Sequence, residues 1–178
     1  MISINLKFLV IFCIIMVLGS CKEADKKSDD PTSKREDINK ILEESNKILL
    51  SIEDQEIDDF VERHNLDVKK TGSGLRYSIK EQGDGPKAKT GMTAVIEYRI
   101  RLLTGDVVYD SEEDGVKEFE IGRGGVESGL EEGILLLREG DKAIFIMPAH
   151  LAHGVPGDGE KIPKRAGIVY DVELINLK

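Results

Sequence analysis

The clearest pattern in the chain is a strict alternation of apolar and polar residues between positions 96 and 102. One face of an extended chain would carry Ile96, Tyr98, Ile100 and Leu102, and the other would carry Glu97, Arg99 and Arg101. This period of two predicts an antiparallel strand with one buried face and one face in water. Alternating runs at 75–79 and 168–174 predict two more such strands, and the wholly apolar run at 143–147 predicts a strand covered on both faces.

Residues 37–65 have the spacing of a helix instead. They contain no Gly or Pro, and their apolar residues recur at intervals that place them on one helix face. Ser51 and Asp54 form a loose capping box, which predicts one interrupted helix or two short ones. We treat residues 36–66 as a helical arm. It either packs on its own domain or serves in dimerisation or in gripping a client protein.

A second, shorter helix is predicted after residue 127. Ser128 and Glu131 form a capping box at its start, and we expect Gly140 to end it. Its apolar residues share one face: Leu130, Ile134 and Leu137. One short helix among several antiparallel strands predicts an α+β domain over residues 67–178. In such a domain a curved antiparallel sheet wraps around the helix and leaves an apolar hollow between them.

The N-terminus has the features of a secretory signal peptide, which we assign to residues 1–20. Lys7 precedes an apolar run at 8–18 that is too short to span a bilayer. The sequence Leu18-Gly19-Ser20-Cys21 resembles a bacterial lipobox, in which the cysteine receives lipid; the alternative is an ordinary signal with a chance cysteine. Lipid on Cys21 would anchor the protein in the cell envelope, on either face of the outer membrane. Residues 21–35 contain almost no apolar side chains, which predicts a disordered tether. A second interpretation is a surface-export signal.

Composition narrows the chemistry. The net charge of -9 argues against nucleic acid as a partner, and a hydrophobic fraction of 40% suits one core. Cys13 and Cys21 are the only cysteines, so the folded domain has neither a disulfide nor a thiolate nucleophile. His150 and His153 lack further ligands at metal-binding spacing, and the acidic residues between 106 and 114 match no calcium loop. We therefore expect no metal and no cofactor, and a solvated hairpin for the acidic segment.

Several short motifs follow one another between Gly72 and the C-terminus. They are Gly74-Leu75-Arg76-Tyr77, Val95-Ile96-Glu97-Tyr98, Val108-Tyr109-Asp110-Ser111, Gly129-Leu130-Glu131-Glu132-Gly133, Met147-Pro148 with Leu151-Ala152-His153-Gly154, Ile162-Pro163, and Val169-Tyr170-Asp171-Val172-Glu173-Leu174. In this order they resemble the FKBP family of peptidyl-prolyl cis-trans isomerases. The lipobox, tether and arm before such a domain further resemble FKBP lipoproteins of gliding bacteria.

The resemblance implies a set of site residues. Catalytic roles fall to Tyr98, Asp110 and His153, and substrate contacts to Tyr109, Phe119, Val126, Glu127, Leu130, Ile162 and Tyr170. Leu130 stands where the family usually has a Trp floor, and His153 stands where a Tyr hydroxyl usually donates to the substrate. Glu127 replaces an apolar residue whose backbone N–H binds substrate, so we expect its side chain to matter little. The loop at 158–161 is expected to be mobile and to touch the peptide, and one additional residue before Tyr109 is expected to form a bulge.

The implied activity is rotation about X-Pro peptide bonds in proline-containing clients of the envelope. Peptide-bond rotation has a barrier of roughly 18–20 kcal/mol, and an apolar pocket favours the twisted, less polar transition state. His153 would make the activity sensitive to pH, because imidazole changes its charge near neutrality. The alternative is a chaperone that holds proline segments without catalysis, or a structural component of a gliding or secretion machine. The arm and the residues Leu130 and His153 favour that alternative.

Overall fold

The computed structural model describes residues 31–178 and their side chains from residue 34 onward. The predicted signal peptide, Cys21 and most of the predicted tether lie outside these residues. The chain divides after Glu43, and its second compact unit is Glu44–Lys178. Within residues 31–178, no helix is both long and apolar enough to cross a membrane.

The predicted arm is one continuous helix, α2 (Pro31–Arg63). The expectation of a break at Ser51 is wrong, and the helix begins at Pro31, inside the range predicted as tether. The hydroxyl of Ser51 donates to the carbonyl of Ile48 at 2.7 Å, three residues earlier in the same helix. A serine that bonds within the helix in this way does not cap a new one.

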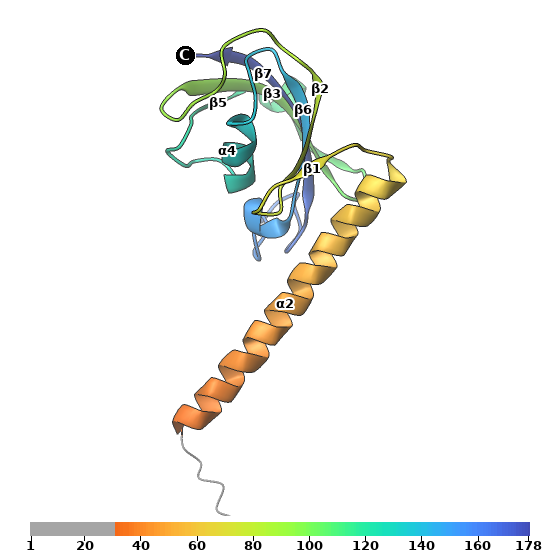
Figure 1. Cartoon of the computed structure of the whole chain (residues 1–178), viewed down its shortest axis with the longest axis vertical. Coiled ribbons are helices and arrows are strands. Elements are labelled where there is room, and N and C mark those ends of the chain that lie inside the picture. The colour runs from red at the N-terminus through yellow and green to blue at the C-terminus, as the bar shows by residue number, and fades with distance from the viewer. Residues whose placement is uncertain (1–30) are drawn as a thin grey trace, which may run out of the picture. The chain divides into compact units, whose positions relative to one another are not determined.

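The predicted antiparallel sheet is present, and it curves against one short helix, which confirms the α+β fold (Figure 1). Its strands are β1 (Lys69–Lys70), β2 (Arg76–Glu81), β3 (Thr93–Leu102), β4 (Val107–Asp110), β5 (Lys117–Glu120), β6 (Lys142–Met147) and β7 (Ile168–Leu177). The order across the sheet is β1-β2-β6-β7-β3-β4, and β5 pairs with β3. The short helices are α3 (Ser111–Asp114), α4 (Ser128–Ile134) and a 3-10 turn, η1 (Ala149–Leu151).

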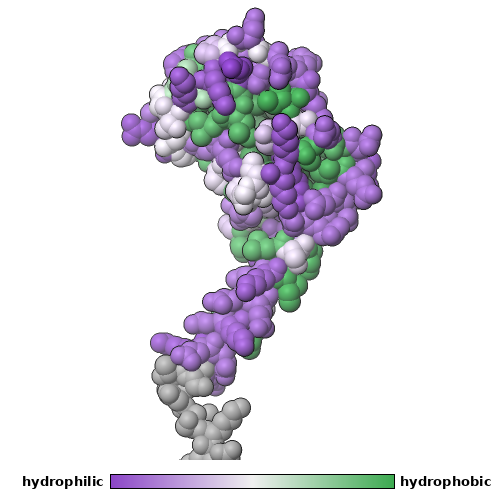
Figure 2. All heavy atoms as spheres, in the orientation of Figure 1, coloured by the Kyte–Doolittle hydropathy of each residue, from purple (hydrophilic) through white to green (hydrophobic). Residues whose placement is uncertain are grey.

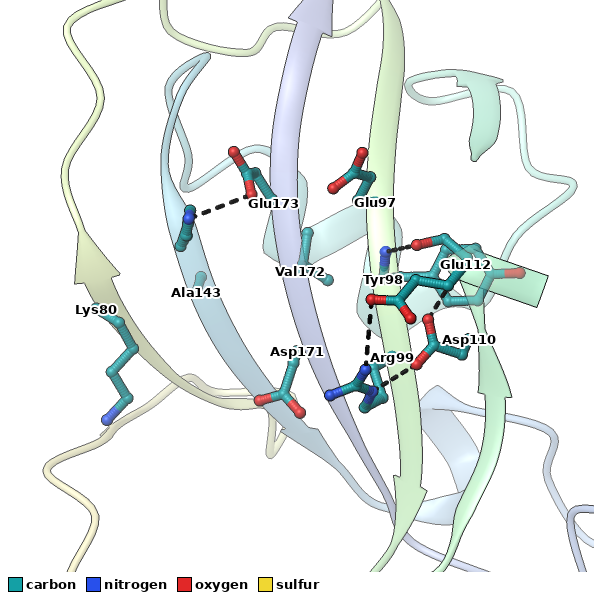
Figure 3. A pocket seen from close by; sticks show the side chains of 12 residues that line it. Lys80, Glu97, Tyr98, Arg99, Asp110, Glu112, Ala143, Asp171, Val172 and Glu173 are labelled. Atoms are coloured by element: carbon teal, nitrogen blue, oxygen red, sulfur yellow. Dashed lines mark hydrogen bonds and ion pairs between the residues drawn. The ribbon is translucent and has the colours of Figure 1, made fainter. Parts of the chain in front are cut away.

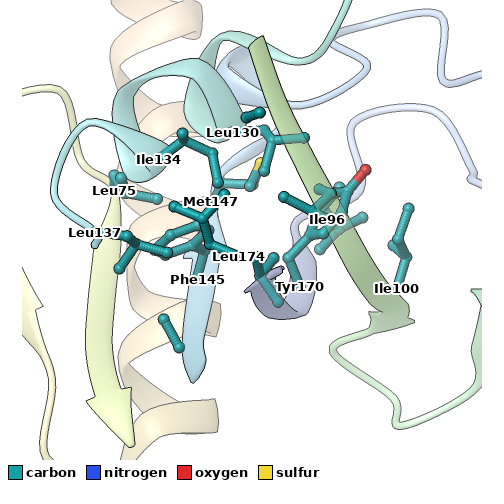
Figure 4. Close-up of a cluster of buried hydrophobic side chains, with 14 of the residues drawn as sticks. Leu75, Ile96, Ile100, Leu130, Ile134, Leu137, Phe145, Met147, Tyr170 and Leu174 are labelled. Atoms are coloured by element: carbon teal, nitrogen blue, oxygen red, sulfur yellow. The ribbon is translucent and has the colours of Figure 1, made fainter. Parts of the chain in front are cut away.

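Two layers of apolar side chains hold this unit together. The larger core lies between the sheet and α4, and Figure 4 shows residues from both, among them Ile96, Leu130, Phe145 and Tyr170. The smaller core joins Ile57 and Phe60 of α2 to Ile144, Ile146 and Val169. Strand β6 is therefore covered on both faces, as its unbroken apolar run predicts. The C-terminal part of α2 packs on its own domain.

Helix α4 differs from its prediction at both ends. Its N-cap is Glu127, which makes no side-chain cap bond, so the predicted capping box is wrong. The carboxylate of Glu131 instead accepts from the amides of Gly122 at 2.6 Å and Gly124 at 3.0 Å. These glycines have left-handed backbone, which turns their amides toward the carboxylate. The helix ends at Ile134 and not at Gly140, because tighter three-residue turns follow it.

The connection from β3 to β4 contains the predicted bulge. Ile100 pairs with Tyr109 and Arg101 pairs with Val107, so Val108 is the additional residue. The acidic segment that follows is a turn of helix, α3, and not only a solvated hairpin. It forms because the carboxylate of Asp110 accepts from the amide of Glu112 at 2.9 Å and caps the helix.

Candidate active site

A hollow opens beside β3 and β4, on the side of the sheet that carries the larger core. It has a volume of about 330 Å³ and is lined by Tyr98, Ile100, Tyr109, Asp114, Lys117, Glu127, His153 and Asp158. A neighbouring hollow of about 450 Å³ is lined by Lys117, Gly125, Val126, Glu127, Ala152 and His153. Lys117, Glu127 and His153 line both hollows. These three side chains therefore form the boundary between the two.

Most of the residues implied by the family resemblance gather here. Tyr98, Tyr109, Glu127 and His153 line the first hollow directly, and Val126 lines the second. The remaining apolar members, Phe119, Leu130, Ile162 and Tyr170, are buried in the larger core. Leu130 is fully buried, so it belongs to the packed base of the domain.

Asp110 is directed away from the hollow. Neighbouring residues of a strand point to opposite faces, so Tyr109 faces the hollow while Asp110 faces the outer side of the sheet. There its carboxylate accepts from Nε of Arg99 at 2.5 Å, as Figure 3 shows. The amide of Glu112 and the guanidinium of Arg99 hold the pKa of Asp110 below its ordinary value. Its role in the structure is to cap α3, and a catalytic role stays a prediction.

The loop at 158–162 is fastened to the hollow through Tyr109. The phenol of Tyr109 donates to Asp158 at 2.5 Å, and this bond is the main reason that the pKa of Tyr109 is raised to about 12. Asp158 also accepts from the amides of Glu160 and Ile162, both at 2.8 Å. Burial opposes ionisation of Asp158, but these hydrogen bonds outweigh it and lower the pKa to about 2. These bonds hold residues 158–162 in a turn clasped to Tyr109, and the mobility expected of this loop stays a prediction.

The side chain of Glu127 is turned into the site, and the expectation that it matters little for the substrate stays a prediction. Its carboxylate is only 8% exposed. The phenol of Tyr170 donates to its Oε1 at 3.1 Å, and burial together with this carboxylate raises the pKa of Tyr170. Nε2 of His153 lies 3.1 Å from the same oxygen but without the alignment of a hydrogen bond. His153 therefore faces the site and is not a solvent-directed side chain.

Lys117 is the main residue that sequence reasoning missed. Its ammonium donates to the phenol oxygen of Tyr170 at 2.9 Å and lies 5.0 Å from the ring centre of Tyr98. A signal for it was present, because Lys117 stands two residues before Phe119 and must share its face of the strand. Asp114, from α3, also lines the hollow without having been singled out. Among residues 31–178, no cluster of His, Cys, Asp and Glu side chains is arranged to hold a metal ion.

Comparison with known proteins gives a family for this domain. The model of the FKBP-type peptidyl-prolyl cis-trans isomerase family matches residues 85–175. A probable FKBP-type isomerase, FkpA, of Neisseria meningitidis is 38% identical over 111 residues, which are 62% of this chain and 40% of that protein. FK506-binding protein 2 of Dictyostelium discoideum is 39% identical over 111 residues, which are 61% of this chain and 84% of that protein.

Solved structures of FKBP-type proteins have the same fold as this domain. The crystal structure of AtFKBP13 covers 64% of this chain and 100% of its own with a TM-score of 0.61 at 30% identity. That of FkpA from Escherichia coli covers 99% of this chain and 84% of its own, with a TM-score of 0.64 at 25% identity. The chain spans less than half the length of the Neisseria relative that it matches. The chain belongs to the FKBP-type peptidyl-prolyl cis-trans isomerase family.

Proposed function

We propose that the protein catalyses cis-trans isomerisation of X-Pro peptide bonds in the hollow beside Tyr98 and Tyr109. The observation that carries the proposal is this hollow, which lies where the family motifs converge. X-Pro bonds are the natural substrate, because only these bonds populate both isomers and exchange slowly. No covalent bond is made or broken in this reaction, so it requires no nucleophile among the residues that line the hollow.

The apolar walls of the hollow can lower the barrier to rotation without covalent chemistry. A peptide bond loses its resonance and part of its charge separation when it is twisted. The walls formed by Tyr98, Ile100 and the ring of Tyr109 offer apolar surface to the proline ring. Binding to such walls favours the twisted amide over the planar one, which is differential binding of the transition state.

A refolding assay tests this proposal. Residues 31–178 are added to a protein whose refolding is limited by prolyl isomerisation, and the rate is compared with that of two variants. We expect Tyr98→Ala to reduce the acceleration of refolding by at least about tenfold, whereas Tyr77→Ala should leave it unchanged. Tyr77 is a matched control because it is also partly buried against the larger core but does not line the hollow. Wild-type protein that leaves the rate unchanged would contradict catalysis.

One observation favours a second function, binding of proline segments without turnover. The ammonium of Lys117 lies over the ring of Tyr98, on a face that a proline ring would contact. A cation at this position does not suit a less polar transition state, so a proline segment could bind here without faster isomerisation. This function predicts that a proline peptide binds, with shifts in the amide resonances of the hollow, while its isomerisation rate stays at the uncatalysed value.

We infer that α2 pairs with a second copy of the chain. Its exposed apolar residues are 38–61% accessible, and Figure 2 shows hydrophobic residues along the mostly hydrophilic helix. They are Ile38, Ile41, Leu42, Ile48, Leu49, Leu50 and Ile52. Ile38, Ile41, Ile48 and Ile52 follow one another at intervals of three, seven and four residues, which suit a helix–helix seam. The solved FkpA structure also covers nearly all of this chain.

The oligomeric state tests the pairing. We expect light scattering to report a dimer for residues 31–178 and a monomer for Ile41→Glu. Asn46→Glu is the control, because it adds the same charge on an exposed residue that is not three or four positions from Ile38, Ile41, Ile48 or Ile52. A monomeric wild type would contradict the pairing.

We further propose that the protein is a lipoprotein of the bacterial envelope that assists the folding of envelope proteins. The support is the sequence Leu18-Gly19-Ser20-Cys21. The order of lipobox, tether, arm and isomerase domain resembles that of FKBP lipoproteins of gliding bacteria. We therefore propose that the client belongs to a gliding machine. In a cell fractionation, Cys21→Ser should move the protein from the membrane to the soluble fraction. Membrane retention at the wild-type level would contradict the lipid anchor.

A further inference from the structure

Helix α2 places one carboxylate against the FKBP-type domain. The side chain of Glu53 is 12% exposed, and its Oε2 is buried with no hydrogen-bond partner among residues 34–178. Within these residues its ion-pair partner is Arg165, whose Nε lies 3.9 Å from Oε1 of Glu53. A largely buried carboxylate is unfavourable without a nearby cation. The guanidinium of Arg165 is therefore what makes Glu53 acceptable at this position.

Arg165 adopts a backbone conformation that is rare for arginine. Its φ is 57°, in the left-handed region that Gly and Asn enter more readily. Such a conformation costs free energy and persists where the surrounding structure holds it. The amide of Arg165 donates to the carbonyl of Gly154 at 3.2 Å, and its side chain pairs with Glu53. The backbone alone would favour Gly here, so we attribute the arginine to its contact with α2.

Residues 154–165, which we call the site loop, border the hollow. Its residue Asp158 lines the hollow, as does His153, which immediately precedes the loop. Asp158 also accepts from the phenol of Tyr109 on β4. At the base, the amide of Arg165 donates to the first residue of the loop and brings its two ends together. The loop is therefore held to β4 through Tyr109 and to α2 through Arg165.

The geometry points to Glu53 and Arg165 as positioning residues through which α2 holds the site loop beside the hollow. The ion pair fixes the base of the loop, and the base sets where His153 and Asp158 stand. Neither Glu53 nor Arg165 is among the described residues that line the hollow, so each acts through the loop and not on the substrate. This inference rests on the proposed isomerase function and gives the helical arm a part in it.

Two variants remove the ion pair. Glu53→Gln keeps the shape of the side chain and removes its charge. Arg165→Asn removes the cation, and asparagine tolerates the left-handed backbone. The control is Glu56→Gln on the same helix, because Glu56 is exposed and forms no ion pair among residues 34–178. For residues 31–178 with the blocked peptide Ala-Leu-Pro-Phe, exchange spectroscopy should show kcat/KM lowered roughly three- to tenfold by each variant and unchanged by the control.

A double variant and the amide spectrum separate positioning from general destabilisation. If the two residues act as a pair, Glu53→Gln with Arg165→Asn should lower kcat/KM no further than either change alone. The amide of Arg165 should exchange with solvent faster in Glu53→Gln, and the amides of His153 and Asp158 should shift. All rates are measured in conditions in which a urea titration shows each variant to be fully folded.

The outcomes separate this inference from the isomerase function. Wild-type kcat/KM in Glu53→Gln overturns the positioning role and leaves the isomerase in place. An equal loss in Glu56→Gln, or losses that add in the double variant, also overturn it. If the wild type does not catalyse, the isomerase proposal fails, and the amide shifts and exchange of the site loop decide the positioning by the same comparison of variants.

Discussion

Arg76 fastens α2 to the sheet, and its replacement gives the sharpest prediction about stability. Its side chain is 1% exposed although it is charged. Nε and Nη2 donate to the carboxylate of Asp58 at 2.9 and 2.5 Å, and Nη2 also donates to the carboxylate of Asp54 at 2.8 Å. The carbonyls of Gly74 and Asp54 accept at 3.2 Å. Arg76→Met keeps the apolar stem and removes every one of these donors.

The size of the effect follows from which groups remain buried. Asp54 and Asp58 are 44% and 53% exposed, so water solvates them when the arginine is lost. The full 3–5 kcal/mol expected for breaking a buried ion pair therefore does not apply. The variant loses a few hydrogen bonds from a charged donor. It also no longer bears the cost of burying the guanidinium, which partly offsets this loss. We expect unfolding to become easier by about 2–3 kcal/mol, or roughly 5–10 °C in Tm.

Urea unfolding of residues 31–178 measures this change. The control is Arg101→Met, because Nε of Arg101 donates to Asp171 at 2.9 Å and its Nη2 forms an ion pair with the same carboxylate, but its side chain is 25% exposed. A surface pair of this kind contributes at most about 1 kcal/mol. Hydrogen exchange should show faster opening of the amides around residues 54–63 in the Arg76 variant alone. Equal destabilisation by the two variants would refute the argument that Arg76 fastens α2.

Two further predictions concern α4 and the clasped loop. Gly133→Ala would place a methyl group 2.6 Å from the ring of Phe145, so the free energy of unfolding should fall by about 1–3 kcal/mol despite the better helix propensity of Ala. The control is Gly72→Ala, whose methyl group meets no atom within 4 Å and should change that free energy by less than about 0.5 kcal/mol. Equal denaturation midpoints for the two variants would contradict the clash. Asp158→Asn should lower the pKa of Tyr109 from about 12 toward the ordinary 10.0, as measured by carbon NMR of the phenol, and an unchanged value would contradict the clasp. The raised pKa of Tyr109 stabilises the fold below pH 10 and is lost as the pH rises toward 12, whereas the lowered pKa of Asp158 stabilises it above about pH 4 and is lost as the pH falls toward 2.

The sheet could be predicted from the sequence because its hydrophobic period is local. Ile96, Ile100 and Leu174 are buried on the face that the alternation indicates. The end of α4 could not be found in this way, since apolar residues continue to Leu137 without a break and hide the change of turn type. The capping box failed for a related reason, because the partners of Glu131 lie in a preceding glycine loop.

The position of the site could be predicted because family motifs mark it. The grouping of charged side chains around it could not. Lys117, Glu127 and His153 come from three separate segments, and no spacing in the sequence relates them. The same holds for Arg76, whose carboxylate partners lie 18 and 22 residues away on α2. Asp110 shows the opposite case, in which a motif residue is present but the pleat of β4 turns it away from the hollow.

Acceleration of prolyl-bond rotation in the hollow beside Tyr98 can be measured directly. Two-dimensional NMR exchange spectroscopy of a proline peptide, with residues 31–178 at catalytic concentration, measures that rotation without a coupled enzyme. We expect exchange peaks between the cis and trans forms that are absent without the protein, and shifts of the amides of Tyr98, Tyr109 and Glu127 in the same sample. Exchange that stays at the uncatalysed rate, or acceleration without any shift at these three residues, would contradict catalysis in this hollow.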